Sequence, residues 1–396
     1  MLKSAGHPLS FPERVKNGPM GPIPLLFLVV TFDRGGAERV LTRCSIGLPR
    51  EKYAVRVAAL QRRSGAIAAD LARAGVLTHD LDMRGKWDLR VCIRLARLLR
   101  RERIRVLFAF MFHATLLSRV VGLLCRVPIR ITSEHSMDAE GPGRRLLNRW
   151  TAPLATHVVA VSERVAAYAS RQFRIPPDRL TTIVNGVDCA HFRPAEKSQH
   201  LRPSVIGCTA RLHADYDHAT LLQAFARLGG RWPEVQLLLV GRGKEESSLR
   251  VLAEALGVAG RVLFVGEQAD VAPWLAQTTV YVQPSRTAGI PISILEAMAT
   301  GLPVVATAVG GTSEVVADGE TGLLVPPGDP VVLAEALDTL LGNPAMSVAF
   351  GCAGRARVEA HFSETRMLEQ VEALLDTLVV QHLGLTFDPS KGWVKC

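Results

Sequence analysis

The sequence predicts an α/β protein made of two doubly wound parallel-sheet domains that face each other across a cleft. The chain has 396 residues with 48% hydrophobic content, which is too long for one α/β unit and suits two separate cores. Short apolar runs alternate with helical patterns along nearly the whole sequence, as in parallel sheets covered by helices. This alternation pauses once, in a polar stretch with two prolines over residues 191–203, where we place the linker between the domains.

The first alternating series predicts an N-terminal Rossmann-like domain over residues 23–190. Buried strands are expected at 25–30, 55–60, 76–81, 106–110, 129–132, 157–161 and 180–184, and helices at 37–48, 89–101, 114–125 and 163–173. Residues 1–22 are expected to form a disordered leader. The apolar run at 22–30 is too short for a membrane helix and has no small-residue cleavage site after it, so it indicates a first buried strand and not a signal peptide.

The second series predicts a C-terminal Rossmann-like domain over residues 204–362. Strands are expected at 204–210, 235–240, 262–265, 280–283, 303–307 and 322–325, and helices at 219–228, 249–256, 292–300, 331–341 and 345–360. We expect a helix at 363–380 to pack back on the N-terminal domain and the tail at 381–396 to be loosely ordered. Ligands of open α/β sheets bind beyond the carboxyl ends of the strands, so the site is expected there.

Charge and cysteine content narrow the function classes. The net charge is +10, which favours an anionic partner. The seven cysteines are scattered without a Cys-x-x-Cys pair, which favours reduced thiols in a cytoplasm over a disulfide frame or a zinc site.

Basic residues concentrate between Arg84 and Arg105, where only Asp88 and Glu102 oppose them. Two interpretations stay open. The stretch is either a solvated helix face or a patch that meets anionic lipid headgroups, which would make the protein peripheral on the inner face of a membrane. Nucleic acid is disfavoured, because no aromatic interleaving or recognition motif accompanies the charge.

Two glycine loops follow predicted strands. Gly35 and Gly36 precede a helix, so their backbone could approach a ligand and the helix start could face an anion, although a simple tight turn is the alternative. The loop from Gly241 begins like a dinucleotide fingerprint, but its third glycine would fall at Glu246. A nicotinamide-dependent dehydrogenase is therefore disfavoured.

The most specific segment runs from Pro284 to Val305, where a strand ends, a glycine turn follows and a helix begins. Pro291 falls in the first helical turn, where its missing N–H costs nothing. The N–H groups of residues 292–294 would then point out of the helix start and could hold a diphosphate. Glu296 lies about one turn further in, within reach of ribose hydroxyls.

Several motifs occur together in a specific order. They are Gly35-Gly36-Ala37-Glu38, Val159-Ala160-Val161-Ser162-Glu163, Asn185-Gly186-Val187-Asp188, Arg211-Leu212, the 284–305 segment and Gly310-Gly311-Thr312-Ser313-Glu314-Val315-Val316. From about Leu25 to Val380 the sequence resembles glycosyltransferase family 4, whose fold is the two-domain GT-B arrangement. Met111-Phe112-His113-Ala114 and Thr132-Ser133-Glu134-His135 are similar to members that build bacterial surface polysaccharide and lipopolysaccharide.

The resemblance implies a retaining hexosyltransferase (EC 2.4 class) that needs no metal or other cofactor. Arg211 matches the arginine that neutralises the donor phosphates, Glu296 the ribose-binding glutamate, and His113 lies near a histidine that contacts the donor sugar. A core histidine is an equal alternative for His113. The donor-binding positions that the resemblance implies are Gly35, Gly36, Arg211, Gly289, Pro291, Ile292, Ser293, Ile294 and Glu296. The resemblance also implies that Gly310 to Glu314 are structural.

Three positions depart from the family pattern. Tyr216 stands where the phosphate-binding lysine is expected, Ala288 where the first glutamate of a Glu-x7-Glu pair is expected, and Phe110 where a histidine is expected. Tyrosine offers a neutral hydrogen bond in place of a point charge. An engineered knockout, a natural inactive homologue and an active enzyme that uses other groups all stay open.

We therefore expect transfer of a sugar from a nucleoside diphosphate donor, a UDP-sugar, to a hydroxyl of a lipid-linked or polysaccharide acceptor by a cytoplasmic protein. Because the sequence offers no evident nucleophile, positioning and leaving-group stabilisation would carry the catalysis. The alternative is a catalytically impaired pseudo-glycosyltransferase that acts as a binding module. The sequence does not specify the donor base, the sugar, the acceptor or the oligomeric state.

Overall fold

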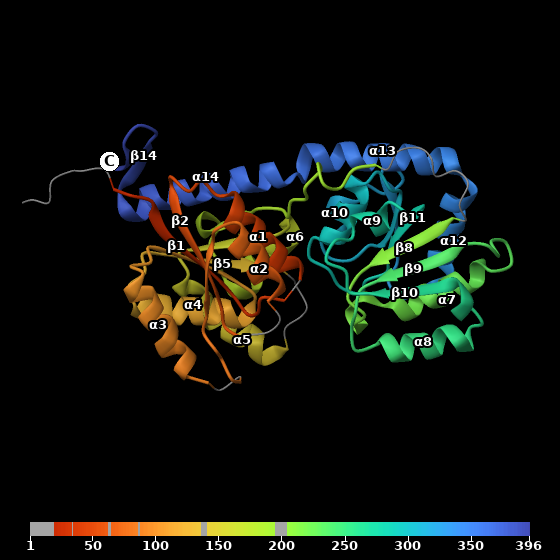
Figure 1. The fold of residues 1–396 in the computed structure, drawn as a ribbon, viewed down its shortest axis with the longest axis horizontal. Helices are drawn as coiled ribbons and strands as arrows, with labels where there is room; N and C mark the ends of the chain where they lie inside the picture. The colour runs from red at the N-terminus through yellow and green to blue at the C-terminus, as the bar shows by residue number, and fades with distance from the viewer. Residues whose placement is uncertain (1–19, 34, 62–64, 86–87, 136–140, 195–203) are drawn as a thin grey trace, which may run out of the picture.

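The computed structural model describes residues 20–33, 35–61, 65–85, 88–135, 141–194 and 204–396. Most of the expected leader, most of the expected linker, Arg34 and Lys86 lie outside these residues. Two parallel sheets with helices on both faces stand next to each other, and a long pair of C-terminal helices runs along both (Figure 1). The predicted fold class, two Rossmann-like α/β domains, is confirmed.

The first sheet has seven parallel strands in the order β3-β2-β1-β4-β5-β6-β7. Its strands are β1 (Ile23–Val29), β2 (Tyr53–Ala59), β3 (Leu77–Asp80), β4 (Val106–Phe110), β5 (Ile129–Glu134), β6 (His157–Ala160) and β7 (Leu180–Thr182). Its helices are α1 (Gly36–Gly47), α2 (Ala66–Arg73), α3 (Arg90–Arg101), α4 (Phe112–Leu124), α5 (Pro142–Thr151) and α6 (Glu163–Phe173), with 3₁₀ turns η1 (Ala152–Leu154) and η2 (Pro177–Arg179). The strand order reverses between β1 and β4, the kind of place where open α/β sheets bind ligands.

The second sheet has six parallel strands in the order β10-β9-β8-β11-β12-β13. Its strands are β8 (Val205–Thr209), β9 (Gln236–Val240), β10 (Val262–Gly266), β11 (Val280–Gln283), β12 (Val304–Thr307) and β13 (Gly322–Val325). Its helices are α7 (His218–Leu228), α8 (Glu246–Ala255), α9 (Ala272–Leu275), α10 (Ile292–Ala299), α11 (Thr312–Val315) and α12 (Pro330–Gly342), with 3₁₀ turns η3 (Ala214–Tyr216) and η4 (Ala259–Arg261). Here the order reverses between β8 and β11.

Local sequence fixes several helix ends. Ser162 accepts a hydrogen bond from the Val165 N–H and so caps α6, and Asp329 caps α12 in the same way. Gly384 ends the last long helix in the left-handed conformation, at φ 61°, which glycine adopts without steric cost. The Ser162 cap explains why the helix predicted at 163–173 begins in the structure where the sequence placed it.

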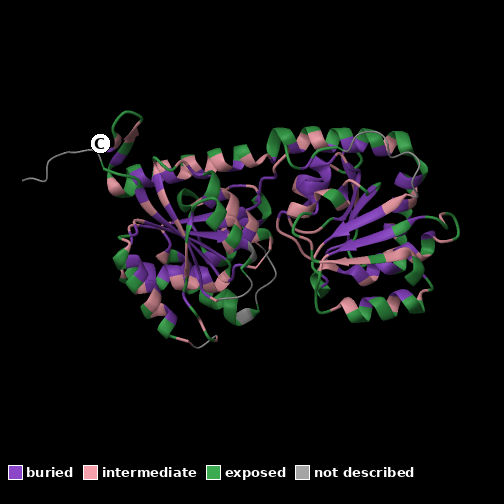
Figure 2. Cartoon of the chain, in the orientation of Figure 1, coloured by how far each residue is buried: buried purple, intermediate pink, exposed green. Residues whose placement is uncertain are grey.

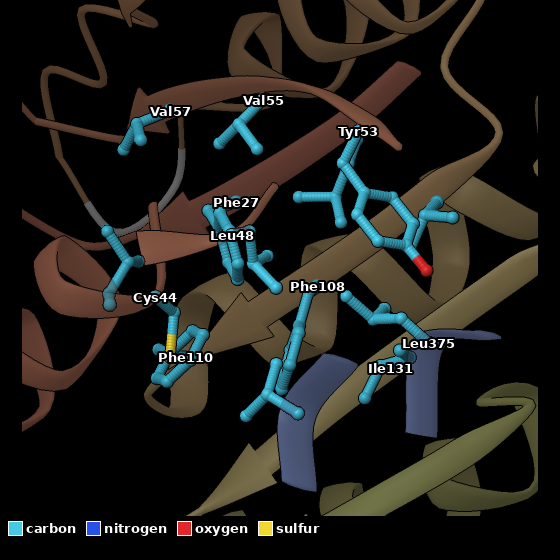
Figure 3. Packing of buried hydrophobic residues seen from close by; sticks show 14 of the residues in the cluster. Phe27, Cys44, Leu48, Tyr53, Val55, Val57, Phe108, Phe110, Ile131 and Leu375 are labelled. Carbon is cyan, nitrogen blue, oxygen red and sulfur yellow. The ribbon is translucent and has the colours of Figure 1, made fainter. Parts of the chain in front are cut away.

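Each sheet is buried between apolar helix faces (Figure 2). In the first domain, Phe27, Phe108 and Phe110 pack as an aromatic cluster, with the Phe108 and Phe110 ring centroids 4.9 Å apart. Leu375, from the far end of the chain, packs beside Ile131 and Phe108 in the same core (Figure 3). The C-terminal helix is therefore part of the first domain's core.

The C-terminus contradicts the expectation of a loosely ordered tail. Helices α13 (Pro344–His361) and α14 (Glu364–Leu383) lead to a hairpin of β14 (Leu385–Asp388) and β15 (Gly392–Lys395). Trp393 is buried against the Tyr53 ring, and its Nε1 donates to the Lys52 carbonyl oxygen at 2.8 Å. Because the segment is short and polar, with no long apolar run, its pattern did not indicate that one tryptophan would anchor it.

Four short helices were also not predicted: α2, α5, α9 and α11. Their lengths, four to ten residues, leave little periodic pattern to recognise. Of these, α5 shapes the surface most, because it lies on the outer side of the first domain and exposes most of its residues.

Candidate functional site

The site elements follow the carboxyl ends of strands in both sheets. In the first domain, β1 leads into the Gly35–Gly36 turn and the start of α1. In the second domain, β11 leads through a loop into the start of α10. A β-carbon built on Gly36 would lie 3.6 Å from Cδ1 of Ile292, so the two helix starts meet across the domain boundary.

A buried polar network fixes the start of α10. The Gln283 side chain, at the end of β11, accepts hydrogen bonds from Ser293 Oγ and Tyr281 OH, both at 2.9 Å. Its Nε2 donates to Ser285 Oγ, also at 2.9 Å. Pro291 is the N-cap residue and makes no side-chain capping bond. The Ile294 N–H donates to the Pro291 carbonyl oxygen at 3.1 Å, so the N–H groups of Ile292 and Ser293 are the ones that could face an anion.

Glu296 is buried one turn into α10, with 2% of its surface exposed. Burial raises the pKa of its carboxyl, and the charges of Arg39 and Arg43 on α1 lower it in opposition. Arg39 Nη1 donates to Glu296 Oε1 at 2.5 Å. The expected ribose-binding carboxylate is therefore held by a cation from the other domain.

Arg211 follows β8 and lies next to Glu38 of α1. Glu38 is buried, which raises the pKa of its carboxyl, and the neighbouring Arg211 charge lowers it in opposition. The Glu38 side chain folds over Gly35, where a built β-carbon would fall 2.2 Å from Oε2. Glu38 and Arg39 are thus neighbours on α1 whose side chains face the other domain. Glu38 lies against Arg211, and Arg39 lies against Glu296.

Tyr216 lies beside Arg211 and not out in solvent. The Arg211 guanidinium carbon is 5.9 Å from the centroid of the Tyr216 ring, at the outer limit of a cation–π contact. Where a second cation was expected, the chain therefore has an aromatic ring that lies against the Arg211 guanidinium. The following residue, Asp217, is buried at a positive φ of 45° and forms an ion pair with Arg286, with Nε 3.0 Å from Oδ2.

Ala288 and Gly289 are held between the two domains. The Gly311 N–H donates to the Gly289 carbonyl oxygen at 3.0 Å, and a β-carbon built on Gly310 would fall 1.7 Å from the Ala288 carbonyl oxygen. A β-carbon on Gly289 would fall 2.1 Å from the carbonyl oxygen of His135. Only glycine allows either approach, so position 289 must be glycine for the domains to meet here, and position 310 must be glycine for two loops of the second domain to pack together.

His135 is the site residue that the sequence did not single out. It follows β5, its Nε2 lies 3.0 Å from Ser133 Oγ, and burial lowers its pKa to about 4, so it is neutral at pH 7. Phe110 lies at the end of β4 with its ring 5.6 Å from the His135 ring. His113 instead lies on the first turn of α4, against Phe112. The signal that could have found His135 is a polar residue directly after a buried strand.

A buried ion pair lies at Glu134, the residue directly before His135. Arg119 of α4 is fully buried, and its Nη2 lies 2.9 Å from Oε1 of Glu134. It also donates to Thr132 Oγ1 at 3.1 Å and to Asn148 Oδ1 at 2.7 Å. This network ties β5, α4 and α5 together next to the site.

A second carboxylate, that of Glu314, joins the two domains a few residues after Gly310. Glu314 accepts hydrogen bonds from the backbone N–H groups of Glu163 and Arg164, at 2.9 and 3.0 Å. These N–H groups belong to the start of α6, so Glu314 caps a helix of the other domain. Arg164 Nη1 in turn donates to the Gly310 carbonyl oxygen at 3.1 Å.

The structure thus brings together the start of α1 with Gly35 and Gly36, the start of α10, Glu296 and Arg211. His113 lies on the first turn of α4, directly after the carboxyl end of β4, with its ring against Phe112. Among the described residues, no group of three or more His, Cys, Asp or Glu side chains is arranged to hold a metal ion. Within the same residues, no helix has both the length and the apolar character to cross a membrane.

Comparison with known families gives two matches along the chain. Residues 34–191 match the model described as Glycosyltransferase Family 4, and residues 203–343 match the model described as Glycosyl transferases group 1. The first match begins after β1 and covers the other strands of the first sheet, and the second match covers the second sheet.

Individual relatives agree with these matches. The chain is 30% identical over 273 residues to the lipopolysaccharide core biosynthesis mannosyltransferase LpsB of Rhizobium meliloti, covering 65% of this chain and 74% of the relative. It is 34% identical over 241 residues to a GDP-mannose-dependent mannosyltransferase of Corynebacterium glutamicum that acts on a monoacylated phosphatidylinositol monomannoside, covering 55% and 62%.

Solved structures of low sequence identity share the fold. The Anabaena protein HepE, in complex with UDP, superposes with a TM-score of 0.78 at 21% identity, covering 90% of this chain and all of that one. WaaG, a glycosyltransferase involved in lipopolysaccharide biosynthesis, superposes with a TM-score of 0.72 at 17% identity, covering 88% and 99%.

Proposed function

The chain belongs to glycosyltransferase family 4, and we propose that it moves a sugar from a nucleoside diphosphate donor to a hydroxyl of a lipid-linked or saccharide acceptor. The observation that carries the proposal is the meeting of two helix starts, at Gly36 and Ile292, with Arg211 beside them. Two helix N-termini and a guanidinium at one place form a site for a diphosphate.

The proposed chemistry is a substitution at the anomeric carbon. The bond from this carbon to the diphosphate oxygen breaks, and the diphosphate takes the electron pair. A bond to the acceptor oxygen forms, and the acceptor hydroxyl loses its proton to an oxygen of the leaving diphosphate. Arg211 and the start of α10 would stabilise the charge that develops on the leaving diphosphate, with no metal ion required. The retention of anomeric configuration is an expectation from the family.

Glu296 and His135 would act on the rest of the donor. A carboxyl group one turn behind the phosphates suits the ribose hydroxyls, and Arg39 opposes the rise that burial gives to the pKa of the Glu296 carboxyl. His135 would face the sugar, because its backbone adjoins Gly289 and burial keeps its ring neutral, able to donate or accept a hydrogen bond. We therefore propose His135 as a candidate sugar contact in addition to His113.

The donor base has two candidates. A UDP-sugar is the expectation from the sequence, and HepE was solved with UDP. The named mannosyltransferase relatives, one of them GDP-mannose-dependent, favour GDP-mannose.

The same relatives act in lipopolysaccharide core synthesis and on a phosphatidylinositol mannoside, which supports a lipid-linked acceptor. We place the reaction in the cytoplasm, where the seven cysteines would stay reduced, and all seven are free thiols here.

Calorimetric titration of the full chain with UDP, GDP and ADP, and then with UDP-glucose and GDP-mannose, tests the proposal. We expect micromolar binding of one nucleotide, lost in Arg211→Ala. The matched control is Arg250→Ala, an arginine of the same domain that pairs with Glu246 on the outer side of α8. Its affinity should equal that of the unmodified chain.

Absence of binding to every nucleotide would refute the donor site and leave a pseudo-glycosyltransferase that keeps the fold alone. Equal losses in the Arg211 and Arg250 variants would show that general charge, and not this site, attracts the nucleotide.

A further inference from the structure

Helix α5 carries an apolar stripe that faces away from the protein. Leu146, Leu147 and Trp150 are 58%, 41% and 74% exposed. Successive helix residues lie about 100° apart, so these three side chains share one side of α5 and Asn148 points to the other. Asn148 is the inward residue, since it is buried and bonded to Arg119. An amphipathic helix of a globular protein normally has the opposite orientation, with its apolar face in the core.

The two neighbouring helices extend this surface. Helix α4 lies between α3 and α5 on the same side of the first domain (Figure 1). Its outer residues Val120, Leu123 and Leu124 are exposed, and so are Leu89 and Ile93 at α3. Scattered exposed apolar residues are ordinary, but this set gathers on adjacent helices and so marks an interaction surface.

The rim of this surface is basic. Its exposed arginines are Arg90, Arg97, Arg100, Arg101, Arg103, Arg126, Arg144, Arg145 and Arg149. Two carboxylates that the structure describes near α3 are paired with arginines, because Glu102 pairs with Arg56 and Arg101, and Asp88 with Arg94. An apolar stripe with a tryptophan, bordered by an excess of exposed arginines, complements a bilayer interface with anionic headgroups.

We propose that the outer face of α3, α4 and α5 docks the protein on an anionic lipid bilayer, with Leu146, Leu147 and Trp150 entering the interface. The sequence pattern had drawn attention only to the arginines near α3, while the structure puts the insertion at α5. The Arg144 guanidinium lies over the Phe112 ring, 5.0 Å from its centroid, at the start of α4. The docked face therefore adjoins the carboxyl end of β4, on the same edge as the site. Lipid binding lies beyond the proposed function, and it can be measured without any donor.

Co-sedimentation of the full chain with phosphatidylcholine vesicles, with and without phosphatidylglycerol, tests the proposal. We expect binding to vesicles that contain phosphatidylglycerol, and a loss of at least about tenfold in the partition coefficient of Leu147→Ser/Trp150→Ser. The matched control is Val251→Ser/Val348→Ser, since both valines are similarly exposed on helices of the second domain, at 65% and 64%. It should bind as the unmodified chain does.

A charge variant tests the rim. Arg145→Gln/Arg149→Gln should lower the partition coefficient about 25-fold, since each basic residue at an anionic surface contributes about a fivefold change. Arg171→Gln/Arg227→Gln, which removes two exposed arginines elsewhere, should change it less than about twofold. Each variant is exposed, so its thermal unfolding should match the unmodified chain.

Three outcomes would overturn the proposal. The first is no binding to anionic vesicles, and the second is equal binding by the α5 variants and their controls. The third is sedimentation velocity that shows self-association through Trp150 without lipid binding, which would make the face a contact between two copies of the chain.

Discussion

Arg39 donates a 2.5 Å hydrogen bond to Oε1 of Glu296, and this ion pair joins the first helix of one domain to the site helix of the other. Burial raises the pKa of Glu296 above its ordinary value, and the charge of Arg39, followed by that of Arg43, lowers it in opposition. The charge state of a residue in the second domain therefore depends on a side chain in the first. We therefore expect domain contact and donor binding to be coupled through this pair.

Removing Arg39 should make nucleotide binding more sensitive to acid. In Arg39→Ala, the pKa of Glu296 rises further above its usual value, so the carboxyl takes up a proton at a higher pH than in the unmodified chain. A protonated carboxyl is a weaker acceptor for ribose hydroxyls. As the pH is lowered, the nucleotide affinity of the variant should therefore begin to fall at a higher pH than that of the unmodified chain. Calorimetric titration from pH 5 to pH 8 measures this, with Arg73→Ala, an exposed arginine of α2, as the control. Superimposable pH profiles for the two variants would refute the coupling.

The Glu314 cap should stabilise the contact between the domains. Glu314→Ala leaves the Glu163 and Arg164 N–H groups without their carboxylate acceptor, a loss of about 1 kcal/mol of unfolding free energy for a helix cap. Urea unfolding measures it, and donor affinity should fall in parallel because the same loop holds Gly289. The exposed Glu320 provides the control, Glu320→Ala. A stability equal to that control would show that the cap contributes nothing.

Trp393 should anchor the C-terminal hairpin. Trp393→Ala removes a buried side chain that packs against Tyr53 and Phe387, with an expected loss of about 3–5 kcal/mol. Thermal or urea unfolding reports the loss, while exposed Lys395→Ala on the same strand should be neutral. If both variants unfold alike, the hairpin does not contribute to the stability of the first domain.

Buried neutral histidines should make the fold sensitive to acid. Burial lowers the pKa of His157 to about 4 from 6.5, so the unfolded chain binds a proton there between these values while the folded chain does not. Stability from this group is therefore present above pH 6.5 and is lost as the pH falls toward 4, by about 3 kcal/mol at most.

His157→Gln should flatten this acid limb and keep a polar partner for Thr181 Oγ1, which lies 2.8 Å from His157 Nε2. Urea unfolding between pH 4.5 and 7.5 tests it, with His213→Gln at an exposed position as the control. An acid limb of unchanged slope would exclude His157 as its source.

Restoring the two departed charges should raise activity. Ala288→Glu/Tyr216→Lys adds a carboxylate near the reacting carbon and a second cation near Arg211, and one such electrostatic contact is typically worth about 100-fold in turnover. Sugar transfer from the donor identified by titration measures the change. Ala288→Gln/Tyr216→Met adds similar bulk without charge and should not raise turnover. No gain over that neutral variant would mean that the chain uses other groups.

The sequence by itself determined the fold class and most of the elements. Strands at 106–110, 280–283 and 322–325 agree with the structure to the residue, because buried parallel strands are continuous apolar runs bounded by turns. The sequence also placed Gly35, Gly36, Glu296 and Arg211 at strand ends or helix starts, where parallel topology gathers them. The hairpin and α5 lacked such runs and were not predicted.

Only the tertiary structure decided which of these residues meet across the domains. The pairs Arg39–Glu296 and Glu163–Glu314 are separated by about 257 and 151 positions, and no local pattern encodes such contacts. The approach of His135 to Gly289 depends on how the two sheets are docked, so the sequence alone did not single out His135. The same holds for α5, whose apolar residues could face a core or a membrane until Asn148 fixes its inward side. Local chemistry specifies the elements, whereas the partners across the boundary depend on the packing of two separately folded cores.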